Sequence, residues 1–153
     1  MHSEKLFIRQ RGVTLIELMI VVVILALIAG FAYPSYVNYV VDTKRTAASS
    51  ILLQVADRQQ QFFMDNKRFT NDLTNLGFAA NPLVIADDGR TMANAASSDS
   101  TYSVALTNVT ATTYTITAAP LNGQAARDAE CGSLTLNQTL TKGSSGGGDD
   151  CWK

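Results

Sequence analysis

The sequence predicts an α+β protein, in which one long N-terminal helix is followed by a small antiparallel β-sheet. Three observations lead to this fold class. Residues 13–33 are almost entirely apolar, and residues 36–63 continue with apolar side chains at helical spacing. Residues 101–139 contain three short segments rich in Thr, Tyr, Val and Leu, which suit half-buried strands. The 153 residues are enough for one ordinary domain and an attached segment.

The first element is an apolar run that is long enough to cross a membrane. Residues 18–33 carry no charge, and extending the run back to Val13 adds only Thr14 and Glu17 as polar residues. About 20 apolar residues in a helix span a bilayer core of roughly 30 Å. Basic residues precede the run, so the positive-inside rule predicts a cytoplasmic N-terminus and an exported remainder.

Three interpretations of this run compete. It is a secretory signal cleaved after Ala32, a plain membrane anchor, or a segment kept after a short leader ends at Gly12. Glu17 favours the third, because a carboxylate in an apolar helix is costly unless it is paired or lies at the headgroup level. Cleavage after Gly12 gives Val13 a free α-amino group, which is cationic near neutral pH. The sequence therefore predicts that Glu17 pairs with the Val13 amine of a neighbouring subunit.

The residues around Gly12, which read RGVTLIEL, resemble the N-terminal motif of type IV pilins. The resemblance implies that residues 1–12 are a basic leader and that prepilin peptidase cuts between Gly12 and Val13. It also implies methylation of the Val13 amine, although pilins usually begin with Phe. Glu17, the fifth mature residue, is then the acid that these proteins use in assembly.

One helix is expected from about Val13 to Phe63, which is roughly 75 Å at ~1.5 Å per residue. Residues 13–35 suit lipid or a filament core, because they are apolar on all sides. Residues 36–64 have one apolar face, which suits packing beneath a globular head. This face consists of Val37, Val41, Ala48, Leu52, Val55 and Phe62.

Gly30 and Pro34 are expected to be the weakest part of this helix. Glycine lowers helix propensity, and proline removes one hydrogen bond and crowds the preceding turn, so a kink is expected. Pilins carry proline at the twenty-second mature position, where Pro34 stands. The resemblance implies that this region loses helix in assembled pili.

Residues 65–100 are expected to form a connecting loop, with one short helical turn near residues 71–76. Asp87-Asp88-Gly89 is expected to be a plain turn, since it lacks the spaced oxygen ligands of a calcium loop. Residues 101–153 are expected to form the antiparallel head. Its strands are expected at 101–107, 113–119 and 133–139, the first two as a hairpin, and Asn122-Gly123 is expected to be a turn.

The chain has two cysteines, Cys131 and Cys151. Outside the cytoplasm they would most simply form one disulfide, and two free thiols are the alternative. The sequence from Cys131 and the closing Cys151-Trp152 resemble the disulfide-bounded end of PilE-like minor pilins. Residues 61–77, after the long helix, resemble the same group.

Composition argues against catalysis. The single histidine, His2, lies in the predicted leader, and no serine or cysteine nucleophile has a candidate partner. We therefore predict no catalytic residue, no metal and no cofactor. The net charge is −1, and no direct nucleic-acid binding is predicted, because holding phosphates needs a basic stripe.

These observations and the resemblance together predict a structural, non-enzymatic, minor subunit of a type IV pilus, or fimbrium. It would support pilus biogenesis and twitching motility or cell adhesion. Expected partners are other pilin subunits, prepilin peptidase, the inner-membrane pilus assembly machinery and, before assembly, membrane lipid. The chain is expected in the bacterial inner membrane with one pass, and later in an extracellular pilus. Alternatives are a pseudopilin of a type II secretion system and a membrane-anchored envelope binding module.

Overall fold

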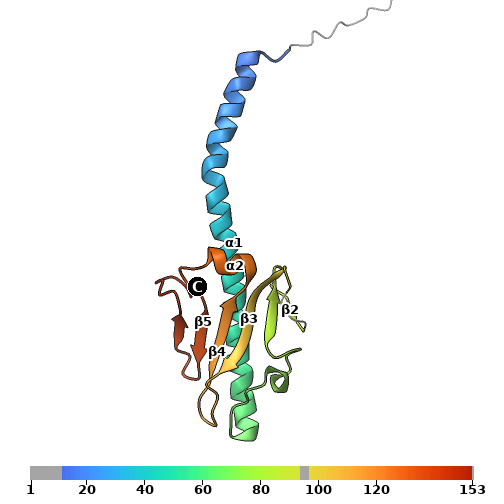
Figure 1. Ribbon diagram of the computed structural model, residues 1–153, viewed down its shortest axis with the longest axis vertical. Coiled ribbons are helices and arrows are strands. Elements are labelled where there is room, and N and C mark those ends of the chain that lie inside the picture. The colour runs from blue at the N-terminus through green and yellow to red at the C-terminus, as the bar shows by residue number, and fades with distance from the viewer. Residues whose placement is uncertain (1–11, 94–96, 153) are drawn as a thin grey trace, which may run out of the picture. The chain divides into compact units, whose positions relative to one another are not determined.

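The computed structural model describes residues 12–93 and 97–152 (Figure 1). The predicted leader, apart from Gly12, lies outside the described residues. The chain divides into two compact units, Met1–Asn38 and Tyr39–Lys153. The elements in chain order are α1 (Leu15–Asn66), the 3-10 helix η1 (Leu73–Leu76), β1 (Leu83–Ala86), β2 (Thr91–Met92), β3 (Ser100–Thr107), β4 (Thr115–Pro120), α2 (Asn122–Arg127), β5 (Leu134–Asn137) and β6 (Lys142–Ser144).

Helix α1 is longer at its C-terminal end than the sequence predicted, since it continues past Phe63 to Asn66. It begins at Leu15, two residues after the predicted start. The helix is uninterrupted through Gly30 and Pro34. A proline inside a helix removes one hydrogen bond without necessarily ending the helix. The proposed loss of helix there concerns assembled pili and stays a prediction.

In the second unit, one antiparallel sheet has the strand order β2-β1-β3-β4-β5-β6. The expected hairpin is present: β3 pairs with β4 over six positions, from Tyr102 opposite Pro120 to Thr107 opposite Thr115. The core lies between this sheet and the C-terminal half of α1, as Figure 1 shows. Four residues of the predicted apolar face are buried in it or beside it, namely Val41, Ala48, Leu52 and Val55. The predicted α+β fold is confirmed.

Three parts of the head differ from the sequence prediction. Residues 65–100 are not only a connecting loop, because they include η1, β1 and β2. Strand β1 has four buried residues that pair with β3, a contact that its short sequence does not reveal. Asn122-Gly123 opens helix α2 instead of forming a turn, and Lys142–Ser144 forms β6. These short elements depend on tertiary pairing, since their own propensities are weak.

Candidate assembly site

The predicted cleavage site lies in exposed, non-helical backbone. Gly12, Val13 and Thr14 precede α1, and the Val13 side chain is 65% exposed. Exposed backbone outside regular structure is where proteases cut most readily. The geometry of the Gly12–Val13 bond therefore suits cleavage before the helix begins.

A hydrogen bond between Thr14 and Glu17 defines the start of the helix. The Glu17 backbone N–H donates to Thr14 Oγ1 at 3.3 Å, and the Leu18 N–H donates to the Thr14 carbonyl at 3.2 Å. Thr14 is thus the N-cap and Glu17 the third helical residue, the spacing of a capping box. The sequence indicated Thr14 only as a polar residue of the run, and its role as the helix cap was not predicted, although Thr-x-x-Glu before an apolar run is a known signal for a helix start.

This capping geometry gives Glu17 two possible roles. A glutamate in the third helical position can support the helix end, and its negative charge also suits the positive end of the helix dipole. The Glu17 carboxylate makes no hydrogen bond or ion pair with the described residues of the chain. Its charge is therefore available to an outside cation, such as the amine of another subunit.

The apolar run of the first unit offers its side chains to the surroundings. Large hydrophobic residues from Val13 to Phe31 are between 46% and 81% exposed. Among the described residues, α1 is the one helix long and apolar enough to cross a membrane. An apolar surface of this extent needs lipid or other helices around it.

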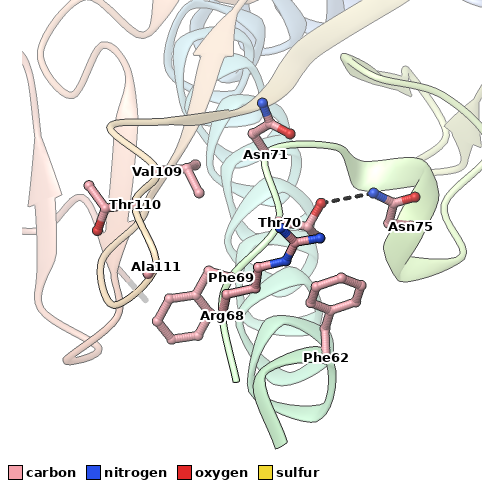
Figure 2. A pocket seen from close by; sticks show the side chains of 9 residues that line it. All are labelled: Phe62, Arg68, Phe69, Thr70, Asn71, Asn75, Val109, Thr110 and Ala111. Carbon is pink, nitrogen blue, oxygen red and sulfur yellow. Dashed lines mark hydrogen bonds between the residues drawn. The ribbon is translucent and has the colours of Figure 1, made fainter. Parts of the chain in front are cut away.

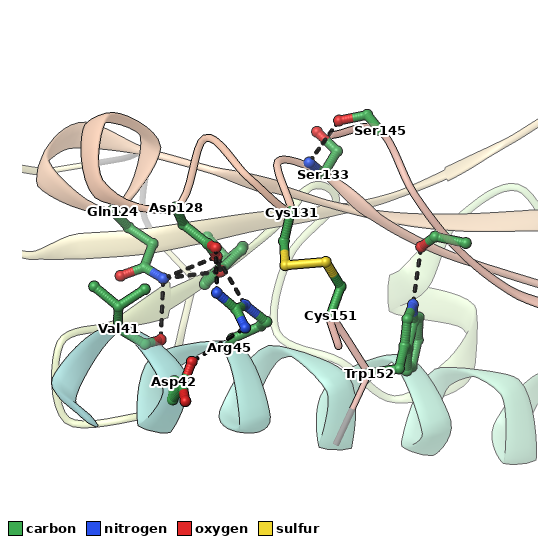
Figure 3. Close-up of a disulfide and its surroundings, with 12 residues drawn as sticks. Val41, Asp42, Arg45, Gln124, Asp128, Cys131, Ser133, Ser145, Cys151 and Trp152 are labelled. Carbon is green, nitrogen blue, oxygen red and sulfur yellow. Dashed lines mark hydrogen bonds and ion pairs between the residues drawn. A yellow bond between two sulfur atoms is a disulfide. The ribbon is translucent and has the colours of Figure 1, made fainter. Parts of the chain in front are cut away.

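In the second unit, a buried ion pair joins α1 to the C-cap of α2 (Figure 3). The Arg45 guanidinium donates to both Asp128 carboxylate oxygens, at 2.5 and 3.2 Å. The Tyr102 hydroxyl and the Gln124 amide also donate to this carboxylate, and the Gln124 amide reaches the Val41 carbonyl. Asp128 is fully buried, so these donors replace the water it has lost.

The same cluster shifts two pKa values. Burial, and then the hydrogen bond to Asp128, raise the pKa of the Tyr102 hydroxyl well above its usual value. The hydrogen bond to Asp128 raises the pKa of Arg45 against the opposing effect of burial. Neither Arg45 nor Asp128 was predicted from the sequence. No local pattern connects these two residues, which are 83 positions apart.

The predicted disulfide is confirmed: Cys131 and Cys151 are bonded, with a sequence separation of 20 (Figure 3). Both cysteines are buried. Trp152 donates its indole N–H to the Gly143 carbonyl at 2.9 Å, and the Lys142 ammonium lies over its ring. The C-terminal segment is thus bonded covalently to Cys131 and held to β6 by the non-covalent contacts of Trp152.

A small pocket lies between the end of α1 and the β3–β4 loop (Figure 2). It has a volume of about 420 Å³. Its polar groups include the Asn75 amide, which donates to Thr70 Oγ1 at 2.9 Å. Figure 2 draws the Arg68 side chain between the rings of Phe62 and Phe69. Arg68 makes no ion pair or hydrogen bond with the described residues.

Acidic residues of the head form no metal centre in the described part of the chain. Asp87, Asp88 and Gly89 form the turn between β1 and β2, as predicted. Asp88 accepts from the Arg90 backbone N–H, which lowers its pKa, and Asp87 pairs with Lys44.

Comparisons with known proteins agree on one family. A family model described as "Type IV minor pilin ComP, DNA uptake sequence receptor" matches residues 34–135. A model of the prokaryotic N-terminal methylation motif matches residues 8–33.

Each of the following curated relatives matches only part of this chain. The type IV major pilin protein PilA of Myxococcus xanthus is 37% identical over 71 residues, covering 46% of this chain and 32% of that protein. A fimbrial protein of Pseudomonas aeruginosa is 32% identical over 81 residues, covering 49% and 53%. The type IV major fimbrial protein FimA of Dichelobacter nodosus is 32% identical over 90 residues, covering 59% and 56%. The chain thus spans between about a third and just over half of the length of these relatives.

The methylation motif and the exposed apolar helix fit a pilin that is held in a membrane before it enters a pilus. The family description names a DNA uptake sequence receptor, which speaks against the expectation that this chain binds no nucleic acid. That expectation was based on the net charge and on the lack of a basic stripe, and it stays a prediction. The minor-pilin model covers more than half of the chain, and this protein therefore belongs to the type IV pilin family.

Proposed function

We propose that this chain is a structural, non-catalytic, minor subunit of a type IV pilus. Prepilin peptidase cuts it between Gly12 and Val13, the new Val13 amine is methylated, and the subunit enters the filament through α1. The observation that carries this proposal is the exposed apolar helix that starts two residues after Val13, within the match to the methylation motif.

The apolar run has different surroundings at the two stages of this pathway. Before assembly, lipid of the inner membrane covers it, and the pilus assembly machinery extracts the subunit. In the filament, the helices of other pilin subunits cover it and exclude both lipid and water. Gly30 and Pro34 form the part of the helix that loses its helical structure in the assembled filament, and this loss allows the filament to stretch.

Glu17 selects the correct register in this assembly. Its carboxylate has no partner among the described residues, and a neighbour's Val13 amine is the closest chemical complement that processing creates. Pairing two desolvated charges gives specificity more reliably than net stability, because desolvation is expensive. An unpaired Glu17 inside the bundle opposes assembly for the same reason.

The test compares Glu17→Gln with Glu17→Ala in cells that lack the natural copy. Glutamine keeps the capping box but not the charge, whereas alanine loses both. We expect both variants to be processed normally and to enter sheared filaments at least about tenfold less, which corresponds to ~1.4 kcal/mol. Thr14→Ser is the matched control and should assemble normally. Normal incorporation of Glu17→Gln would show that assembly does not need the negative charge of Glu17, and it would contradict the proposed pairing.

The same filaments distinguish the remaining alternatives. Immunogold labelling of a tagged copy on surface pili supports a pilus subunit, and sparse labelling supports a minor one. Recovery only with a secretion system supports a pseudopilin. Recovery of single copies in the membrane fraction with Met1 intact supports an anchored binding module. Loss of twitching or adhesion in a deletion strain would then assign the pilus-dependent process.

A second candidate function, favoured by the family description, is binding of DNA during uptake. Several described cations of the head are already engaged: Lys44, Arg45 and Arg90 are ion-paired. Arg58 donates to the Leu76 carbonyl, and Lys67 donates to the Met64 carbonyl. Arg68 is the cation beside the pocket and makes no ion pair with the described residues.

Duplex binding by the detergent-solubilised chain tests this second function across a salt series. Each phosphate contact contributes about −0.9 to the slope of log affinity against log salt concentration. If Arg68 contacts a phosphate, Arg68→Ala lowers the magnitude of that slope by about one. Absence of binding at about 50 mM salt, where electrostatic binding is strong, would remove the DNA function.

A further inference from the structure

Two tyrosines of the first unit mark the end of the apolar run, and a third exposed tyrosine, Tyr39, begins the second unit. Tyr33 and Tyr36 are 73% and 67% exposed. They are three residues apart on α1, so their side chains lie on neighbouring positions of one helix face. Neither hydroxyl makes a hydrogen bond to the described residues. Each residue therefore presents an apolar ring and an unpaired hydroxyl to its surroundings.

The position of these tyrosines matches the thickness of a membrane. The helical part from Leu15 to Tyr33 rises about 27 Å at ~1.5 Å per residue, and the two non-helical residues before it bring the span from Val13 to roughly 30 Å, close to the thickness of a hydrocarbon core. No charged side chain occurs between Glu17 and Asp42. That uncharged stretch is longer than the core, so charge alone does not fix the depth of the helix.

Tyrosine resolves this ambiguity, because an amphipathic ring is most stable at the headgroup level of a bilayer. Tyr33 and Tyr36 differ by about 4.5 Å along the helix axis, which fits within one headgroup layer of ~5 to 8 Å. A core boundary at Tyr33 also places Val13 near the opposite boundary. Glu17 then lies about 6 Å inside the core, within reach of headgroups if its side chain extends toward them.

We propose that Tyr33 and Tyr36 bind the outer headgroup layer of the membrane and set the depth of α1. The partner is the phospholipid interface, with its ester carbonyls and phosphates as acceptors for the two hydroxyls. By fixing the outer end, the tyrosines hold the Gly12–Val13 bond at the inner boundary. This consequence rests on the proposed processing, whereas the binding to lipid does not.

Depth-dependent fluorescence quenching tests the inference on the full chain. The chain is placed in vesicles of phosphatidylethanolamine and phosphatidylglycerol, with quenchers at defined acyl-chain depths. Trp152→Phe removes the native tryptophan, and Tyr33→Trp or Tyr36→Trp reports the site. We expect both tryptophans between about 13 and 20 Å from the bilayer centre. Leu25→Trp is the matched control, and eight residues of rise place it about 3 Å from the centre.

A second variant asks whether the tyrosines themselves set this depth. Tyr33→Leu with Tyr36→Leu extends the apolar surface and removes both hydroxyls. We expect the Leu25→Trp reporter to move by about 3 Å, two residues of helical rise, or to show a correspondingly broadened depth profile. An unchanged profile would overturn the inference.

Two other outcomes also contradict it. If the tryptophan of Tyr33→Trp is quenched at the same depth as that of Leu25→Trp, the tyrosines lie inside the hydrocarbon core. Protection from aqueous iodide that appears only at high protein-to-lipid ratio would identify a second copy of the chain as the partner. Neither the quenching measurement nor the iodide measurement depends on filament formation. Both can therefore be interpreted even if the pilus proposal is wrong.

Discussion

Asp128 shows how one residue can control the packing of the head. Its carboxylate is fully buried and accepts hydrogen bonds from Arg45, Tyr102 and Gln124, which come from α1, β3 and α2. A buried charge is tolerated only when such donors surround it. The three elements are therefore positioned around one acid.

Replacing this acid should be costly. Asp128→Ala leaves Arg45 without its principal partner, with 11% of its side chain exposed, so we expect the unfolding free energy to fall by about 3 kcal/mol or more. Lys44→Ala is the matched control, because it breaks the more exposed pair with Asp87 and should cost less than about 1 kcal/mol. Urea unfolding followed by Trp152 fluorescence measures both. Equal losses of unfolding free energy in the two variants would show that the buried pair stabilises the head no more than the exposed pair does.

Tyr102 should make the head sensitive to high pH. Its folded-state pKa is raised above the usual value near 10, mainly by burial, and burial also raises the pKa of Tyr114. The neutral phenols therefore stabilise the fold fully below about pH 10, and this stability is lost as the pH rises further. Tyr102→Phe should reduce the alkaline fall in unfolding free energy. An identical pH profile in the variant would contradict this.

At the scale of elements, the C-terminal segment depends most on a covalent restraint. Strand β6 has three residues and pairs with β5 at the edge of the sheet. A strand of that length is marginal without help. The Cys131–Cys151 bond and the hydrogen bond of Trp152 to Gly143 hold the chain against this edge.

Removing the disulfide should weaken the whole head and release this segment. A bond that closes a loop of about twenty residues stabilises by roughly 3 kcal/mol in the chain-entropy account. We expect Cys131→Ser with Cys151→Ser to lower the unfolding free energy by about that amount and to increase the exposure of Trp152 to iodide. The unmodified chain should respond in the same way to a reductant. Unchanged stability would mean that non-covalent contacts suffice.

Element by element, the sequence was most informative where a pattern was long. The apolar run and its helical continuation predicted α1, and alternating side chains predicted β3, β4 and β5 to within two residues at every boundary. Strands β1, β2 and β6 and helix α2 escaped prediction. Each has six residues or fewer, so pairing with the rest of the sheet decides its conformation more than its own propensity does.

At the scale of the whole molecule, the hydrophobic core and the exposed apolar run belong to different units of the chain. The core cluster lies entirely in the Tyr39–Lys153 unit, from Ala48 to Cys151. The Met1–Asn38 unit carries the exposed apolar run. We therefore expect the head to fold without the residues of the apolar run.

A fragment of residues 39–153 should consequently be a soluble monomer that unfolds cooperatively, whereas the full chain should require detergent or lipid. Sedimentation and circular dichroism check both expectations. A fragment with the Asp128→Ala change serves as the destabilised control. Aggregation of the fragment, or its failure to unfold in one transition, would show that the first unit contributes to folding of the second.

The sequence by itself determined the apolar helix, the motif from Gly12 to Glu17, the strands of the central hairpin and the presence of two pairable cysteines, because these are local patterns of charge, period and residue type. The tertiary structure decided which cation meets Asp128 and where the edge strands pair. These features depend on groups brought together from distant positions, or on backbone geometry that a hydropathy pattern does not encode.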